Sequence, residues 1–245
     1  MLVLELKAPF AACRPMTAGW YRPTAPTLTP SAAYGLLLNV ACVETRLREE
    51  EPEHAGRVPT SLTRDGLPPV RLAIGLPESV PLPRVQTVYQ QLHNYPIGKE
   101  AGVPAEWAKG AKNNITPMRR EFLAGLHVVF CLDGNEDLED RVRHGLAGAF
   151  NAERYGLPFV GDNAFLIDQL LECKLGEIPA CRWYEPVGQK AGADRVPETA
   201  RLTTWIDRAD MTLTRSELFT PSAKATTEVP QEAWQWIPPN KPEPT

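Results

Sequence analysis

The sequence lacks the signatures of the common enzyme classes. It contains no Gly-x-Gly-x-x-Gly, no Walker phosphate loop, no His-Glu-x-x-His and no Gly-x-Ser-x-Gly. Its four histidines are scattered, and only His93, beside Tyr95 in an extended run, is a candidate general acid or base. No second histidine or nucleophile is linked to His93 by spacing. The sequence therefore favours a binding protein over an enzyme, with no cofactor and no metal site.

Other missing features indicate the cellular compartment of the protein. The five cysteines are odd in number and include no Cys-x-x-Cys, which argues against a disulfide scaffold or a zinc site and for reduced thiols in a cytoplasm. The apolar run within residues 32–43 is well short of the ~20 residues that cross a bilayer. The N-terminus begins with an alternating strand pattern rather than a signal peptide. We therefore expect a cytoplasmic protein that makes no membrane contact.

An excess of positive charge is also missing. Lys and Arg number 26 against 30 Asp and Glu, so the net charge of -4 gives no global attraction to nucleic acid. The balance of charge reverses locally between Pro96 and Arg120, a segment that contains five basic residues and two acidic ones. A stretch of about 20 residues without periodicity is uncommon in a compact domain unless it is functional. Because the flanking runs look like paired strands, we interpret the segment as the tip of a long hairpin; a plain surface loop is the alternative.

Hydrophobic periodicity predicts an α+β fold. The chain of 245 residues can bury one substantial core with an appendage, or two small domains. Alternating patterns predict strands at about residues 2–7, 70–76, 84–95, 122–132 and 165–171. An apolar stretch predicts a buried helix between Ser31, as its N-cap, and Glu44, with only Asn39 and Glu44 in water, and a second helix follows the N-cap Asn135 to Phe150. This order, β-α-β-β-α-β, is the ferredoxin-like pattern that RNA-recognition modules also use.

The domain organisation follows from these elements. Residues 1–172 are expected to form the ferredoxin-like palm, with a long inserted β-hairpin thumb at about residues 84–122. Residues 173–245 are expected to form a small β-rich C-terminal extension that ends in a Pro- and Trp-rich tail. That tail packs against a partner or its own domain, or stays disordered, and the sequence leaves the choice open.

Two loops carry groups suited to binding. The irregular segment after the first strand contains Arg14, Trp20, Tyr21 and Arg22, which are able to contact phosphate or stack on a base, although packing against the domain is an equally good explanation. The segment at residues 156–163 is a turn with two glycines, whose backbone can adopt positive φ and approach a ligand closely.

Four segments in order resemble a known family. They are the N-terminal strand with its aromatic and basic loop, Thr-Pro-Ser-Ala-Ala-Tyr-Gly-Leu-Leu at 29–37, Pro-Met-Arg-Arg-Glu-Phe-Leu at 117–123, and Gly-Leu-Pro-Phe-Val-Gly-Asp-Asn at 156–163. Together they resemble the Cas-five family of CRISPR effector proteins, most closely its DevS-type branch, over about residues 1–172. The resemblance implies a repeat-associated RNA-binding fold that caps the 5′ handle of the guide RNA in a type I Cascade complex. It also implies contacts with the backbone subunit and with the large subunit that senses target DNA.

The candidate site combines the resemblance with the local charge. The basic side chains would neutralise phosphates of a single-stranded RNA end and the aromatic ones would stack on its bases; the full set is Arg14, Trp20, Tyr21, Arg22, Tyr34, Lys99, Trp107, Lys109, Lys112, Arg119 and Arg120.

Catalysis is the alternative that the resemblance raises. Some relatives cut repeat RNA with a tyrosine, a lysine and a histidine, for which the candidates here are Tyr34, Lys99 and His93. This sequence has no adjacent Lys-His pair, so we prefer a non-catalytic subunit. A metal-independent endoribonuclease and a protein-only interaction module remain alternatives, and the complex would serve either interference or RNA-guided transposition.

Overall fold

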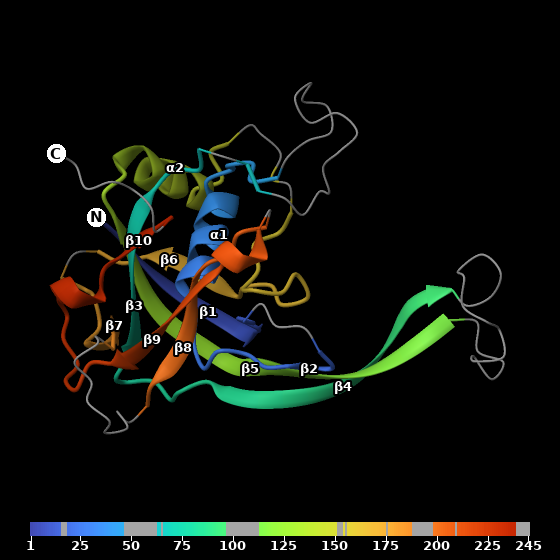
Figure 1. Cartoon of the computed structure of the whole chain (residues 1–245). Helices are drawn as coiled ribbons and strands as arrows, with labels where there is room; N and C mark the ends of the chain where they lie inside the picture. Colours follow the sequence, from blue (N-terminus) through green and yellow to red (C-terminus); the bar gives the residue numbers. More distant parts are fainter. Residues whose placement is uncertain are drawn as a thin grey trace.

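The structure is a computed structural model that describes residues 1–15, 19–46, 63–64, 66–96, 113–150, 154, 156–174, 176–187, 198–208 and 210–238. Within these residues a mostly antiparallel sheet is combined with two α-helices, as the α+β prediction requires (Figure 1). The helices are α1 (Pro30–Val40) and α2 (Glu136–Leu146), with short 3-10 helices η3 (Met211–Leu213) and η4 (Gln231–Ala233). The strands are β1 (Leu2–Ala11), β2 (Tyr21–Arg22), β3 (Val70–Pro77), β4 (Arg84–Pro96), β5 (Asn113–Asp133), β6 (Gln169–Glu172), β7 (Cys181–Pro186), β8 (Ala200–Trp205), β9 (Arg215–Pro221) and β10 (Gln235–Ile237).

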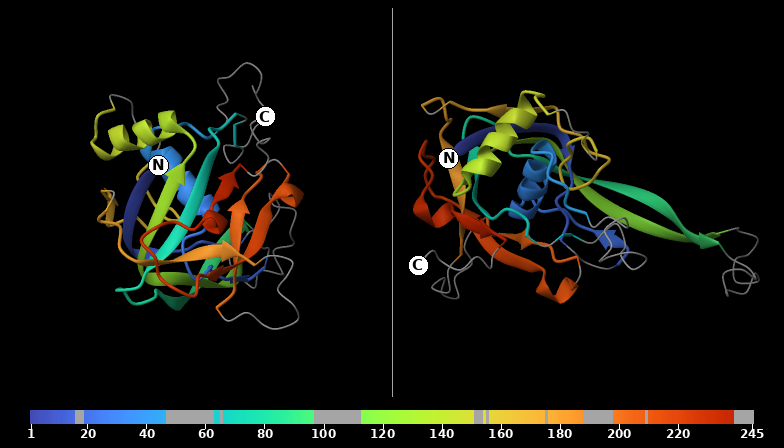
Figure 2. Two further views of the ribbon diagram at one scale, coloured as in Figure 1. Left: turned by 90° about the vertical axis from the view of Figure 1, so that its left-hand side faces the viewer. Right: turned by 90° about the horizontal axis from the view of Figure 1, so that it is seen from above.

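Four strands form the centre of the sheet, in the order β6-β1-β5-β3. Every neighbouring pair in this set is antiparallel. The sheet then continues past β3 through β7, β9 and β8, while β10 pairs with the first half of β3. The C-terminal strands therefore extend the same sheet, and residues 229–238 of the tail pack on the chain's own body rather than outward (Figure 2).

Alternation of apolar residues places the main core on the face of the sheet beneath α1. Leu2, Leu4 and Leu6 of β1 are buried there with Phe130 and with Leu37 of α1. The opposite face is covered by C-terminal residues around Trp183, which is fully buried. The sheet is therefore enclosed on both faces over its central part.

The first helix begins earlier than the sequence predicted. Thr29 is its N-cap, and the Thr29 hydroxyl accepts from the Ala32 amide at 3.4 Å, with Pro30 in the first turn. The expected cap, Ser31, was wrong because proline is favoured at the first helical position, which moves the cap one residue before it. The helix ends at Val40 rather than at Glu44.

The second helix has the predicted cap. The side chain of Asn135 accepts from the Leu138 amide at 3.0 Å, which confirms the prediction, although the helix ends at Leu146 rather than at Phe150. The two helices cross so closely that a Cβ at Gly145 would lie 1.9 Å from the Val40 carbonyl oxygen. Only glycine fits this crossing.

Strands β4 and β5 form a long antiparallel arm that leaves the body (Figures 1 and 2). The β4 side chains from Arg84 to Gln91 are all exposed, so the arm adds nothing to the core on this strand. Strand β5 continues from the arm into the centre of the sheet, where its partner on one edge changes from β4 to β3. Gly125 lies at this change with φ +74, a left-handed conformation that favours glycine.

None of the helices within the described ranges is long and apolar enough to cross a membrane.

Candidate nucleic-acid interface

The root of the arm brings two distant loops of the sequence together. Strand β2 pairs in parallel with β5, so that Tyr21 lies opposite Arg119 and Arg22 lies opposite Arg120. The Arg119 amide donates to the Trp20 carbonyl oxygen at 2.8 Å, which extends the pairing by one residue. The short strand β2 was not predicted, because two residues carry no periodic signal. Its pairing nevertheless brings five of the sequence-predicted binding residues together at the arm root, with Tyr21 and Arg119 on one face of the ladder and Arg22 and Arg120 on the other.

An aromatic and cationic cluster lies at the arm root. The Arg119 guanidinium lies 4.9 Å from the centre of the Tyr21 ring, and the Tyr21 hydroxyl donates to Glu121 Oε1 at 2.5 Å. That hydrogen bond to Glu121, with a smaller contribution from desolvation, raises the pKa of Tyr21, so the phenol stays neutral. Trp20 is 61% exposed and lies beside Tyr21 with ring centres 6.3 Å apart. The cluster therefore presents open aromatic faces, on which a base is able to stack.

The two adjacent arginines share a buried donor without a hydrogen-bond partner in the described part of the chain. Arg119 lies 3.9 Å from Glu121, a long ion pair that leaves its side chain 38% exposed. The Nε atoms of Arg119 and Arg120 are buried and have no hydrogen-bond partner within the described part of the chain. Buried donors without partners are costly, and an anionic ligand with several acceptor oxygens is the kind of group that satisfies them.

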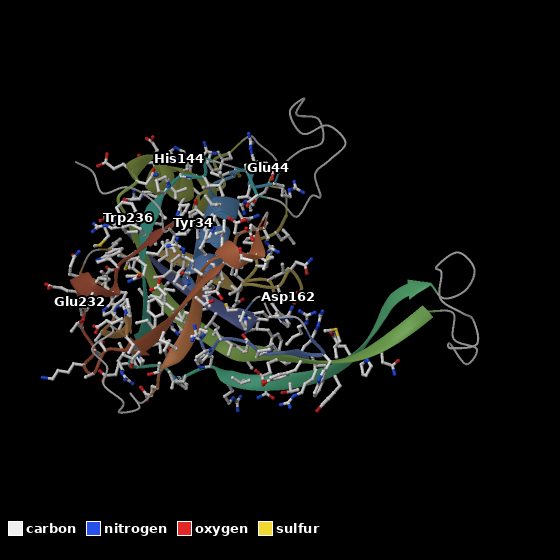
Figure 3. All side chains as sticks on the ribbon, in the orientation of Figure 1. Tyr34, Glu44, His144, Asp162, Glu232 and Trp236 are labelled. Carbon is white, nitrogen blue, oxygen red and sulfur yellow. The ribbon has the colours of Figure 1, made fainter. Side chains whose placement is uncertain are left out.

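A turn from residues 156–163 fixes Arg14 next to this root. Arg14 Nη2 forms an ion pair with Asp162 Oδ2 at 2.5 Å, and Asp162 lies on the side of the body nearer to the arm (Figure 3). Gly161 has φ +72, and a Cβ there would lie 2.3 Å from the Ala12 carbonyl oxygen. The close approach that the sequence suggested for a ligand is thus made by Ala12 instead, and the turn has a structural role.

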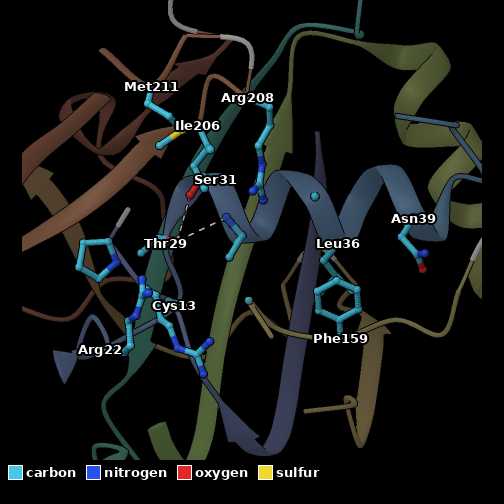
Figure 4. A pocket seen from close by; sticks show the side chains of 15 residues that line it. Cys13, Arg22, Thr29, Ser31, Leu36, Asn39, Phe159, Ile206, Arg208 and Met211 are labelled. Carbon is cyan, nitrogen blue, oxygen red and sulfur yellow. Dashed lines mark hydrogen bonds between the residues drawn. The ribbon is translucent and has the colours of Figure 1, made fainter. Parts of the chain in front are cut away.

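A groove of about 750 Å³ continues from the root along the outward side of α1 (Figure 4). Three arginines, Arg14, Arg22 and Arg208, are among its fifteen lining residues, and none of the fifteen is acidic. Since Arg14 is paired with Asp162, Arg22 and Arg208 supply the positive charge of this lining, in a protein whose net charge is -4. Sequence reasoning missed Arg208 because it lies in an irregular segment after β8, whose position depends on the long-range pairing of β7 with β3 and on the sheet order β3-β7-β9-β8.

Tyr34 does not belong to this surface, which corrects the sequence-based assignment. Its side chain is 4% exposed, its hydroxyl donates to the Pro68 carbonyl oxygen at 2.8 Å, and its ring packs against Trp205 (Figure 3). Desolvation raises the pKa of Tyr34 well above its ordinary value. A buried ring cannot stack on a base, and a buried neutral phenol is a poor proton acceptor. Tyr34 is a packing residue.

The remaining sequence-predicted residues cannot be placed in the interface. Lys99, Trp107, Lys109 and Lys112 lie outside the described residues, and His93 lies in β4 with its side chain outside them. Of the other histidines, His127 contacts Glu5 Oε1 at 2.5 Å and His144 contacts the Asp140 carbonyl oxygen at 2.7 Å.

The cysteines are free thiols, and three of them are buried. Burial raises the pKa of Cys13 to about 11 and that of Cys181 to about 12, so both are neutral at ordinary pH. Within the described ranges, no group of three His, Cys, Asp or Glu residues is arranged to hold a metal ion.

The fold has counterparts among solved structures. No protein-family profile and no curated protein matches the sequence. A chain titled "CRISPR RNA-guided surveillance complex" superposes with a TM-score of 0.53 at 15% identity, over 92% of this chain and 91% of that chain. A second, titled "Crystal structure of Cas protein", has a TM-score of 0.38 at 13% identity, over 89% and 92%. The chain therefore shares its fold with a component of an RNA-guided CRISPR complex.

Proposed function

We propose that this protein is a non-catalytic, RNA-binding subunit of a type I CRISPR Cascade complex, in which it holds the 5′ handle of the guide RNA. The observation that carries the proposal is the root of the arm, where Trp20, Tyr21 and Arg22 lie against Arg119 and Arg120. Exposed aromatics beside paired arginines suit an unpaired RNA segment, because bases stack on the rings while phosphates accept from the guanidinium groups.

The architecture supports the same proposal. The strand order β6-β1-β5-β3, with all neighbours antiparallel and with α1 and α2 as the connections from β1 to β3 and from β5 to β6, supports a ferredoxin-like palm. The arm of β4 and β5 would be its thumb, and the likeness to a surveillance-complex chain extends over nearly the whole sequence. The exposed strand β4 and the C-terminal strands would leave room for the backbone and large subunits, in a cytoplasmic complex with target DNA near the large subunit.

The test of RNA binding replaces both arginines at the root. The full chain carrying Arg119→Ala and Arg120→Ala is titrated against synthetic single-stranded RNA copied from the repeat, over a range of salt concentrations. Loss of two phosphate contacts should lower the affinity and reduce the slope of log K against log salt by about 1.4, at roughly 0.7 per contact. Arg201→Ala removes an exposed arginine on β8 as the control and should change neither quantity. Equal binding by the double variant and the wild type would refute the proposed site.

The non-catalytic assignment has its own assay. The purified chain is incubated with repeat RNA in EDTA, and the RNA is expected to remain intact. Discrete cuts that disappear in His93→Ala would instead establish the metal-independent endoribonuclease, in which a positioned base activates a ribose 2′-hydroxyl.

A further inference from the structure

Helix α1 exposes a glycine in its interior without an internal reason. Gly35 lies in the middle of Pro30–Val40, is exposed, and a Cβ built there would meet nothing within 4 Å. Glycine in a helix interior costs about 1 kcal/mol relative to alanine. Gly145, by contrast, is required by the crossing of the two helices. Packing within the described chain therefore gives no reason for a glycine at position 35.

The space in front of Gly35 is the groove described above. Phe159 and Leu36 lie on one side of it, and Ile206 and Met211 lie on the other (Figure 4). Its volume of about 750 Å³ falls within the range of small-molecule sites. Gly35 is among the lining residues and has no side chain, so a planar group would be able to lie directly on the helix backbone there.

The groove also has polar groups at defined places. Asn39 is 3% exposed, contrary to the sequence expectation that it faces water, and its Nδ2 donates to the Gly156 carbonyl oxygen at 3.2 Å. Its Oδ1 is buried and has no hydrogen-bond partner within the described residues. A buried acceptor without a partner costs roughly 1–3 kcal/mol, which a ligand N–H would recover. Arg22 and Arg208 favour an anionic ligand.

We propose that this groove binds one nucleotide of the guide RNA, with its base lying flat over Gly35. A nucleobase is planar, carries N–H donors for Asn39 Oδ1 and is attached to an anionic phosphate that suits Arg22 and Arg208. Phe159 and Met211 supply the apolar and aromatic contacts for the ring. The proposal rests on the proposed function, since Arg22 both lines the groove and lies opposite Arg120 at the arm root, which gives the RNA one continuous path.

The experiment fills the groove with a leucine side chain at position 35 and removes single bases from the RNA, one position at a time. Wild type and Gly35→Leu are titrated against synthetic single-stranded repeat RNAs, each with one abasic position, which is moved along the oligonucleotide. Leucine is a better helix former than glycine and has open space at this position, so the fold should be unaffected, as thermal unfolding will show. Ala147→Leu adds the same side chain to an exposed position at the end of α2 and is the matched control.

The expected result is a specific coupling between protein and RNA. Gly35→Leu should bind intact RNA about tenfold more weakly, since a stacked base contributes roughly 1–3 kcal/mol. In the wild type one abasic position should cause a similar loss, and in Gly35→Leu that position should cause no further loss. Ala147→Leu should behave like the wild type.

Two outcomes would overturn the inference, and they are distinguishable. If Gly35→Leu binds every oligonucleotide as the wild type does while the double arginine variant is weakened, RNA binds at the root and the groove does not hold a base. If every abasic position lowers the affinity of the wild type equally, the groove again does not hold one particular base. If none of the proteins binds RNA, the proposed function itself fails, and the inference fails with it.

Discussion

At the scale of single residues, the binding surface depends on glycines that permit close approach. Gly161 is the clearest case, because it combines a positive φ with backbone contact to Ala12 and precedes the aspartate that holds Arg14. Gly148 has a similar φ of +66 but open space where a Cβ would stand. Comparing alanine substitutions at Gly161 and Gly148 therefore separates the free-energy cost of a positive φ from the cost of a steric overlap with Ala12.

We expect Gly161→Ala to destabilise the protein much more than Gly148→Ala. An alanine in the left-handed region costs roughly 1–2 kcal/mol, which both variants should show. Gly161→Ala should lose a further amount of about 1–3 kcal/mol, because its methyl group would overlap the Ala12 carbonyl. Chemical denaturation monitored by circular dichroism gives both values. Equal losses would mean that the turn shifts freely and does not fix Arg14.

Residue-level prediction from sequence succeeded where the signal is local. The cap at Asn135 was correctly predicted, because its amide oxygen needs only the first turn of its own helix. Asn39 was misplaced, because polarity alone suggests water whereas Gly156, far along the chain, supplies its partner. Tyr34 was misassigned for the same reason, since Pro68 and Trp205 bury it.

At the scale of elements, the C-terminal segment is fastened to the central sheet around Arg71 on β3. The Arg71 guanidinium lies 5.3 Å from the Trp234 ring centre and 5.9 Å from that of Trp236, and it pairs with Asp133 of β5. Trp236 lies directly opposite Arg71 in the pairing of β10 with β3. One cation thus links β5, β3 and β10.

The ion pair between Arg71 and Asp133 leads us to expect that the free energy of unfolding falls in acid. Partial burial raises the pKa of Asp133, but the hydrogen bond and charge of Arg71 outweigh it, so the pKa is lowered from 3.8. Because the folded-state pKa is below the unfolded one, the stabilisation is complete above the unfolded value and is lost as pH falls through the folded value. For a pair 29% and 27% exposed, it should amount to about 1 kcal/mol.

The measurement is urea denaturation between neutral and acidic pH. The wild type should lose more stability on acidification than Asp133→Asn, which lacks the titrating group. Glu217→Gln, at an exposed position on β9, is the control and should follow the wild type. If the free energy of unfolding fell equally with pH in the wild type and in Asp133→Asn, the stabilising role of the ion pair would be contradicted.

Elements with strong periodicity were found in the sequence, and three strands without it were not. The alternation in β1, β3 and β5 was read correctly because, within the body of the protein, every second side chain of each strand is an apolar residue of the core beneath α1. β2, β9 and β10 were missed because they exist through their partners β5, β8 and β3. The candidate site was therefore predicted as a set of residues, and its assembly through β2 was not.

At the scale of the whole molecule, the arm and the body are separable in stability. Every described β4 side chain from Arg84 to Gln91 is exposed, so the outer arm contributes little to the core. Gln90 lies opposite Met118 in the β4–β5 ladder. These residues are therefore suitable ends for a shorter hairpin.

We expect a truncated arm to keep the fold and lose part of the RNA affinity. Replacing residues 91–117 by Asn-Gly, which favours a tight hairpin turn, should leave the unfolding free energy within about 1 kcal/mol of the wild type. The truncation removes Lys99, Lys109 and Lys112, so the salt slope of RNA binding should fall by about 2, at roughly 0.7 per lost phosphate contact. An unchanged slope would place all of the binding at the root.

The order of the main helices and strands could be predicted from the sequence, but the number of strands that join the central sheet could not. The order of helices and strands follows from local pattern, whereas the pairing of β7 and β10 with β3 joins segments more than a hundred residues apart. The small β-rich C-terminal extension expected from the sequence continues the central sheet in its described part.

The course of β5 through Gly125 determines where the arm points. Strand β1 pairs with β5 on both sides of this glycine, at Leu126 and at Ala124, and β2 pairs with β5 farther out, while β4 takes the other edge from Ala124. The β1 ladder therefore spans Gly125, and turning the arm about this residue would break backbone hydrogen bonds of the body. The same ladder that holds the core strands thereby sets the heading of the arm.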